Sequence, residues 1–243
     1  MTLTVSKIKK HFGGIHALDN CSLEIPEGKI IAIIGPNGSG KSTLFHTISR
    51  LIQKDSGNVT FKGKNISDLE TYQIHKQGIA RTFQEVRLFK NLTIKDHIAI
   101  ALSNEDEKLI NNILVHPKGD DKQIKDSLSL VGLEKPGETF ATDLSYGQRK
   151  LLDLAVAIAK PHTLLMLDEP VAGVNPQLRK QIKTILLKLN KDGETIVLIE
   201  HDMNFVMDLA DYVYVLDEGK VIAKGKPKDI QNNKKVLNAY LGE

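Results

Sequence analysis

Nine consecutive residues combine a flexible backbone, one cation and several hydroxyl groups. They are Gly35, Pro36, Asn37, Gly38, Ser39, Gly40, Lys41, Ser42 and Thr43. The pattern G-x-x-x-x-G-K-[ST], between an apolar run and a helical pattern, is typical of a loop that binds phosphate. Its glycines let backbone N–H groups approach phosphate oxygens, and the helix start attracts anions. We expect Lys41 to neutralise the β- and γ-phosphates of a nucleotide and the Ser42 hydroxyl to bind Mg²⁺. The alternative is a chance glycine turn before a helix, and the flanking patterns count against it.

A pair of acids, Asp168 and Glu169, follows the apolar run Thr163–Leu167. Acids at the carboxyl end of a parallel strand lie where open α/β sheets bind ligands. Asp168 suits Mg²⁺ coordination, directly or through water. Glu169 points another way because it is the next residue, so it could hold and deprotonate an attacking water. An Asp-Glu-Pro turn that only closes a strand is the alternative, and the phosphate-loop pattern disfavours it.

The elements that must position these residues follow from the apolar pattern. Strands are expected at Leu3–Ile8, Cys21–Ile25, Lys29–Ile34, Ile79–Phe83, Thr163–Leu167 and 193–200, with hairpins over 57–66 and 212–223. Helices are expected at Ser42–Leu51, Asp121–Val131, Ser145–Ala159, Pro176–Leu189 and Asn204–Leu209, and the polar stretch 104–121 includes a loop.

This alternation of strands and helices predicts an α/β fold with a mostly parallel core sheet. An N-terminal antiparallel β part precedes it. Residues 86–160 carry helical periodicity without a convincing strand, so they are expected to form an inserted helical subdomain. Residues 1–85 and 161–243 would then form the core of a single domain.

The composition excludes several classes of protein. The chain has 243 residues, 41% of them hydrophobic, and a net charge of +3. It lacks the clustered Lys/Arg that would indicate nucleic acid binding. One cysteine, Cys21, rules out an internal disulfide framework and most Cys-based zinc sites, and it is expected to be a small buried apolar residue. No apolar stretch approaches the ~18 residues of a membrane span. We expect a soluble, cytoplasmic chain that reaches a membrane only through a partner.

Further motifs complete a resemblance to a known family. Gln84 follows IARTF, the segment Leu144-Ser-Tyr-Gly-Gln148 opens a helix, and His201 lies in IEHDM. With GPNGSGKST and LLMLDEP, they resemble the ATP-binding subunit of an ABC transporter. The motifs cover essentially the whole chain in the family's order and spacing. The resemblance implies a P-loop NTPase of the ABC ATPase type.

The resemblance also implies a role for each motif. Phe12 corresponds to an aromatic residue that stacks on adenine, and His201 to a histidine that bonds the γ-phosphate. The implied catalytic residues are Glu169, His201 and Lys41, and the implied Mg²⁺ contacts are Ser42, Gln84 and Asp168. Ser145, Gly147 and Gln148 resemble the signature segment that contacts ATP held by a second subunit. Ser145 is also a good helix N-cap residue, which favours an anion site. The alternatives stay open: an ordinary capped helix, a structural histidine and a core or surface aromatic.

Three departures from the commonest family pattern are visible, and one of them is Ile158, which lies where an arginine is common in the signature helix. Tyr146 replaces the first glycine of the signature, and Asn175 replaces an aspartate of the segment called the D-loop, here Ala172–Asn175. The segments LSYGQ, DEPVAGVNP, EHDMNFVM and VLNAYLGE resemble the branched-chain amino-acid uptake branch, and within it the first of two paired ATPase subunits. ATPases for urea uptake and for lipopolysaccharide export share parts of this pattern and remain alternatives.

The resemblance implies partners as well. Two ATP-binding subunits, either sisters or two copies, would meet head to tail, and integral-membrane permease subunits would dock on the helical subdomain. The chain would lie peripherally on the cytoplasmic face of the inner membrane, with no nucleic acid and no direct membrane insertion. Val86, Leu88, Phe89 and Leu92 either form the docking surface or pack the subdomain core. A soluble, non-transport ABC ATPase is disfavoured because there is one phosphate loop and no heptad array.

Overall fold

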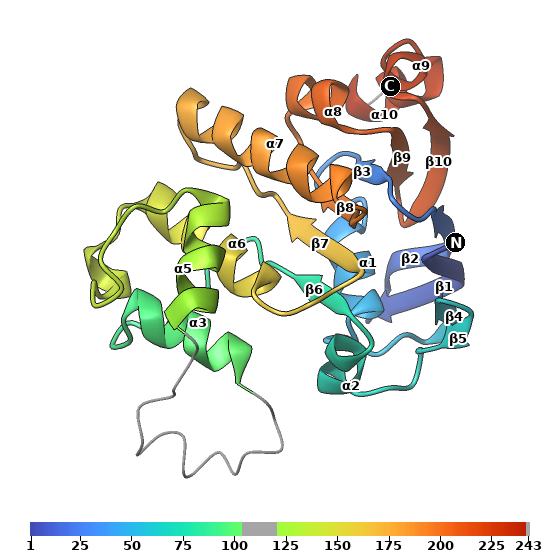
Figure 1. The fold of residues 1–243 in the computed structure, drawn as a ribbon. Coiled ribbons are helices and arrows are strands. Elements are labelled where there is room, and N and C mark those ends of the chain that lie inside the picture. Colours follow the sequence, from blue (N-terminus) through green and yellow to red (C-terminus); the bar gives the residue numbers. More distant parts are fainter. Residues whose placement is uncertain (104–120, 242–243) are drawn as a thin grey trace. The chain divides into compact units, whose positions relative to one another are not determined.

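The computed structural model describes residues 1–103 and 121–241, and these residues form two compact units (Figure 1). Unit 1 comprises Met1–Arg81, His162–Pro170 and Leu186–Glu243. Unit 2 comprises Thr82–Pro161 and Val171–Ile185. Helix α7 (Pro176–Lys191) therefore begins in unit 2 and ends in unit 1.

A six-stranded sheet forms the centre of unit 1. Its strands are β3 (Ile30–Ile34), β6 (Ile79–Arg81), β7 (Leu164–Asp168), β8 (Thr195–Ile199), β9 (Tyr212–Asp217) and β10 (Lys220–Gly225). The order is β10-β9-β3-β8-β7-β6, and every neighbouring pair is parallel except β9 with β10. All residues of β3, β7 and β8 are buried, as expected for central parallel strands. The predicted mostly parallel core sheet is confirmed.

The second sheet of unit 1 is antiparallel, as predicted, with the order β2-β1-β4-β5. Its strands are β1 (Leu3–Phe12), β2 (Ile15–Ile25), β4 (Ser56–Phe61) and β5 (Lys64–Asn65). The first two strands extend well beyond their predicted ends, because the glycine turn at 13–14 keeps polar residues paired across the hairpin. Cys21 is fully buried in the core shared by the two sheets, as predicted, and burial raises the pKa of its thiol to about 12.

Short helices complete unit 1: α1 (Lys41–Ile48), α2 (Thr71–Lys76), α8 (Met203–Leu209), α9 (Pro227–Gln231) and α10 (Lys234–Leu241). The predicted end of α1 at Leu51 is wrong, because the left-handed Arg50 follows the C-cap Ser49 and stops the helix. Leu44, Phe45 and Ile48 bury the apolar face of α1 in the core. That packing fixes the helix that begins at the glycine-rich loop.

Unit 2 is mostly helical, with α3 (Ile94–Leu102), α5 (Asp121–Val131), the 3-10 turn η1 (Ala141–Asp143) and α6 (Tyr146–Ile158). Its buried residues repeat at helical spacing, as in Ile124, Leu128 and Val131 of α5. Apart from Asp121, the predicted polar loop at 104–121 lies outside the described residues. Within residues 1–103 and 121–241, no helix combines the length and hydropathy that crossing a membrane requires.

Candidate functional site

The glycine-rich loop has backbone dihedral angles, and neighbouring atoms, that residues other than glycine rarely accommodate. Gly35 follows β3 with φ 152°, and a Cβ there would lie 2.0 Å from the Leu216 carbonyl oxygen. Gly40 has φ 101°, and a Cβ there would lie 2.3 Å from the Ala17 carbonyl oxygen. The loop is therefore packed against β2 and β9 at both ends, as a strand-to-helix anion loop requires.

Lys41 begins α1 and folds back over this loop. Its ammonium Nζ donates to the carbonyl oxygens of Gly35 (2.9 Å) and Pro36 (2.8 Å) and to Ser39 Oγ (3.3 Å). Burial lowers the pKa of Lys41, whereas the carboxylates of Glu169 and Asp168 act in the opposite direction. Unit 1 thus brings together the cation and both acids that the sequence predicted as a site.

Asp168 ends β7 with only 2% of its side chain exposed. Arg81, at the end of the adjacent β6, places its guanidinium Nη2 3.6 Å from Asp168 Oδ2. Arg81 Nη1 also donates to Ser49 Oγ at 2.6 Å and to the Phe45 carbonyl oxygen at 3.4 Å, both on α1 or its cap. Sequence reasoning missed Arg81, although an arginine at the end of a short apolar strand was the available signal.

Glu169 has a left-handed backbone with φ 50°, which is uncommon for a residue other than glycine. Its N–H donates to the Ile199 carbonyl oxygen at 3.0 Å, across to the end of β8. Its Oε1 lies 3.0 Å from His201 Nε2. The two residues predicted to act on water and on phosphate therefore contact each other at the carboxyl ends of neighbouring parallel strands.

The remaining predicted residues of unit 1 lie near this loop. Ser42 and Thr43 occupy the first turn of α1. Phe12 ends β1 with 45% of its surface exposed. It lies at the tip of the hairpin whose second strand passes the loop at Ala17.

The other predicted residues belong to unit 2. Ser145 caps α6, where its Oγ accepts from the Gln148 N–H at 3.3 Å and Gln148 Oε1 accepts from the Ser145 N–H at 3.0 Å. This capping box confirms the predicted helix start. Gly147 packs so closely on α7 that a Cβ would lie 2.5 Å from Leu178 Cδ2. A groove of about 550 Å³ runs over these residues and the start of α7.

Tyr146 and Lys150 connect three segments of unit 2, which sequence reasoning did not foresee. The Tyr146 hydroxyl donates to the Ala172 carbonyl oxygen at 3.4 Å, and its ring lies 3.3 Å from where a Gly173 Cβ would be. One turn later, Lys150 Nζ donates to the Gln84 carbonyl oxygen at 3.3 Å and lies 6.0 Å from the centre of the Tyr146 ring. The signature helix is thus joined to the segments of Gln84 and of Ala172–Asn175.

The oxygen atoms of the site suit a hard divalent cation that is shared with a phosphate ligand. Mg²⁺ prefers carboxylate, hydroxyl and phosphate oxygens, and proteins usually bind it through one or two side chains. Asp168 and Ser42 supply such oxygens in unit 1. Among the residues that the structure describes, no group of three or more His, Cys, Asp or Glu side chains forms a self-sufficient metal site.

The chain also matches known families and proteins. Residues 18–172 match the family described as ABC transporter, and residues 220–243 match the branched-chain amino acid ATP-binding cassette transporter family. The chain is 35% identical to the high-affinity branched-chain amino acid transport ATP-binding protein LivG of Salmonella typhimurium, over 99% of this chain and 98% of that protein.

Two solved structures are similar in fold. One is a nucleotide-free ATP-binding cassette from an ABC transporter, with a TM-score of 0.87, 33% identity and coverage of 100% of this chain and 99% of that one. The other is the dimeric post-hydrolysis state of an ATP-binding cassette bound to ADP and Pi. It has a TM-score of 0.79, 26% identity and coverage of 93% and 98%.

Proposed function

The chain belongs to the ATP-binding cassettes of the ABC transporter family, and from this premise we propose that it hydrolyses MgATP to power uptake of branched-chain amino acids. The observation that carries the proposal is the cluster of Lys41, Asp168, Glu169 and His201 around the phosphate loop of unit 1. The cluster supplies a cation, a candidate metal ligand and a base beside one anion site.

In the proposed complex, the loop Gly35–Thr43 binds the phosphates and Phe12 stacks on the adenine. Lys41 exchanges its loop carbonyls for phosphate oxygens, which are stronger partners for an ammonium group because they are charged. Ser42 and Asp168 of unit 1 would hold Mg²⁺, and the family resemblance assigns a further contact to Gln84 of unit 2. The cation, when bound, neutralises negative charge that develops on the transferred phosphoryl group.

Hydrolysis then depends on positioning. Glu169 orients the attacking water and accepts its proton, and its Oε1 lies 3.0 Å from His201 Nε2. His201 holds the γ-phosphate. The left-handed backbone of Glu169 supports this role, since strained residues persist where the surrounding fold imposes a functional direction.

The second half of each site comes from a partner in this proposal. Ser145, Gly147 and Gln148 of unit 2 contact the ATP bound by a second cassette, in a head-to-tail pair with a sister subunit or a second copy. The start of α6 suits this role because a capped helix N-terminus attracts anions. ATP then contributes binding energy to closure, and its hydrolysis reopens the pair.

The transport assignment adds a membrane partner. We place the chain peripherally on the cytoplasmic face of the membrane, bound to integral-membrane permease subunits through unit 2. Phe89 supports this docking surface, because 64% of its surface is exposed in a segment beside Gln84. The resemblance of residues 220–243 to a branched-chain amino acid family supports the choice of substrate.

The test is uptake of labelled leucine by cells that lack this chain. The cells are complemented with the unmodified chain or with Glu169→Gln. Restoration by the unmodified chain alone supports amino-acid import powered at Glu169. If leucine uptake does not depend on the chain, the substrate assignment is wrong, and uptake of urea and export of lipopolysaccharide are measured next in the same cells.

A further inference from the structure

The aromatic ring of Phe12 is not held by burial. Phe12 ends β1, Ile15 begins β2, and the two residues are paired across the turn. Both are exposed, Phe12 by 45% and Ile15 by 70%. Apolar packing therefore does little to orient the ring, and its direction depends on how the tip of the hairpin is held.

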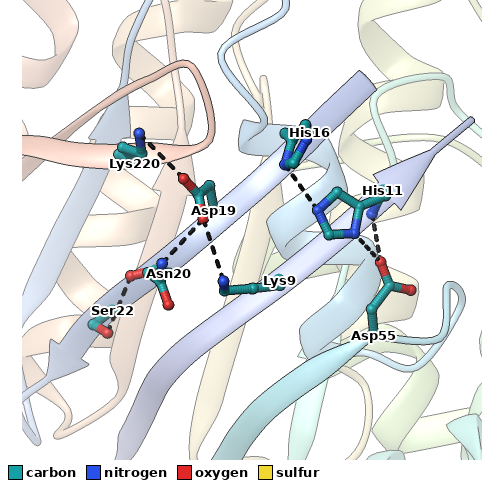
Figure 2. A network of polar contacts seen from close by, with 8 residues as sticks. All are labelled: Lys9, His11, His16, Asp19, Asn20, Ser22, Asp55 and Lys220. Atoms are coloured by element: carbon teal, nitrogen blue, oxygen red, sulfur yellow. Dashed lines mark hydrogen bonds and ion pairs between the residues drawn. The ribbon is translucent and has the colours of Figure 1, made fainter. Parts of the chain in front are cut away.

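A chain of polar contacts holds this tip, running from His16 through His11 to Asp55 (Figure 2). His16 Nδ1 lies 2.8 Å from His11 Nε2, and His11 Nδ1 lies 2.9 Å from Asp55 Oδ2. The His11 backbone N–H donates to the same Oδ2 at 2.6 Å. Lys10 Nζ donates to Asp55 Oδ1 at 3.0 Å and lies 5.2 Å from the centre of the Phe12 ring. Asp55 thus holds both residues that precede Phe12.

The base of the hairpin is fixed to the phosphate loop. The carbonyl oxygen of Ala17 packs on Gly40, where a Cβ would lie at 2.3 Å. The Asp19 N–H donates to the Gly219 carbonyl oxygen at 3.0 Å, and the Gly219 N–H donates to the Ser39 carbonyl oxygen at 3.0 Å. Because the base is anchored, movement of the tip changes where Phe12 lies relative to a nucleotide in the loop.

The charge of Asp55 sets the donor and acceptor roles of the two histidines. The side-chain bond from Lys10 and the backbone bond from His11 lower the pKa of Asp55, so its ionised carboxylate accepts from His11 Nδ1–H. In neutral His11 the Nε2 atom is then an acceptor, and His16 Nδ1–H is the donor.

We propose that Asp55, His11 and His16 are positioning residues that hold the Phe12 ring where adenine stacks. This inference rests on the proposed function as an ATP-binding subunit. Loss of the network weakens binding of an adenine nucleotide and leaves binding of its phosphates unchanged.

Other charged groups surround the histidine pair. Lys10 and Asp55 face His11 from β1 and from the segment before β4. Asp19 on β2 interacts electrostatically with His16, and its own partners are Lys9 at 3.8 Å and Lys220 at 3.1 Å. Apart from Asp55, these groups are unchanged in every variant proposed below.

The experiment compares the affinity of the full chain for ADP with its affinity for inorganic pyrophosphate, by calorimetry at pH 7.5. Base–aromatic stacking contributes enough that Phe12→Ala should weaken ADP binding about 5-fold or more. Asp55→Asn should weaken it about 3-fold or more by displacing the same ring, with pyrophosphate binding within about twofold. The matched control is Asp68→Asn, which removes another exposed lysine–aspartate pair (3.4 Å) and should change neither affinity.

Two further measurements separate positioning from a general structural effect. In the Phe12→Ala background, Asp55→Asn should have no additional effect on ADP, because coupled residues are not additive. His16→Asn keeps a side-chain N–H donor for His11 Nε2, so it should retain ADP affinity at pH 7.5.

The outcomes distinguish this inference from the proposed function. If neither ADP nor pyrophosphate binds, the nucleotide site itself is wrong. If both bind and Asp55→Asn changes them equally, or adds fully to Phe12→Ala, the positioning role is refuted.

Discussion

Removing Arg81 should destabilise unit 1, because it takes a positive charge away from the buried carboxylate of Asp168. The side chains of Arg81 and Asp168 are 9% and 2% exposed, and their charged atoms lie 3.6 Å apart. Coulomb's law gives about 5 kcal/mol at that distance with an effective dielectric constant of 20. Breaking a buried pair by removing one partner costs about 3–5 kcal/mol. Lys41 also stabilises the carboxylate, so we expect Arg81→Met to lose about 3 kcal/mol of unfolding free energy.

The assay is urea unfolding of the full chain followed by circular dichroism, with EDTA present to exclude divalent cations. The double variant Arg81→Met/Asp168→Asn removes both charges and should be more stable than Arg81→Met alone. That recovery separates the charge effect from lost packing of the long side chain. A loss below about 1 kcal/mol for Arg81→Met, or full additivity in the double variant, would refute the reasoning.

Three further predictions concern local geometry. Gly40→Ala should lower the melting temperature and the affinity for ATP, because its Cβ would lie 2.3 Å from the Ala17 carbonyl oxygen at φ 101°. Asp153→Asn should raise stability at pH 8 by about 1 kcal/mol and not at pH 4, measured by urea unfolding, because burial raises the pKa of Asp153 to about 7. Lys150→Met should cost about 1 kcal/mol and speed hydrogen exchange around Gln84, whose carbonyl oxygen loses a donor.

The sign of the Asp153 prediction follows from linkage. A carboxyl group whose folded pKa lies above its unfolded value stabilises the fold when it is protonated, and that contribution is lost as pH rises from about 4 to about 7. Equal stability of Asp153→Asn and the unmodified chain at pH 8 would contradict it. The control for Gly40→Ala is Gly63→Ala, which has a similar left-handed backbone (φ 77°) with open space at its Cβ position and lies outside the loop. Unchanged hydrogen exchange near Gln84 would contradict the prediction for Lys150→Met.

Elements with strong internal patterns could be predicted from the sequence. The continuous apolar runs of β3, β7 and β8 became fully buried strands, and α5 begins and ends where its period indicates. The predicted fold class is confirmed as an α/β core of the ABC cassette type. These elements can be recognised from their own residues, because burial of one face or of both faces determines where apolar residues occur in the sequence.

Other elements depend on distant residues and escaped prediction. Helices α2, α9 and α10 are short, so tertiary packing decides their existence more than periodicity does. The outer ends of β1 and β2 are polar and are paired by the hairpin. In the site, the sequence motifs indicated Lys41 and Asp168. The contact of Arg81 with Asp168 could not be predicted, because it depends on the pairing of β6 with β7.

The structure shows what Tyr146 and Asn175, two departures from the commonest family pattern, contact. Tyr146, which replaces a glycine, contacts the Ala172–Asn175 segment. Asn175, which replaces an aspartate, accepts the Leu178 N–H at 2.8 Å with its side-chain oxygen and so caps the start of α7. Both residues therefore stabilise the surface that we propose for the second cassette.

The central claim is that this chain hydrolyses ATP with Glu169 as the residue that activates water. The most direct measurement is phosphate release from MgATP by the unmodified chain and by Glu169→Gln, with MgATP affinity measured on both. We predict that turnover falls to background in the variant while MgATP binding is retained. Full turnover by Glu169→Gln, with binding unchanged, would contradict the account.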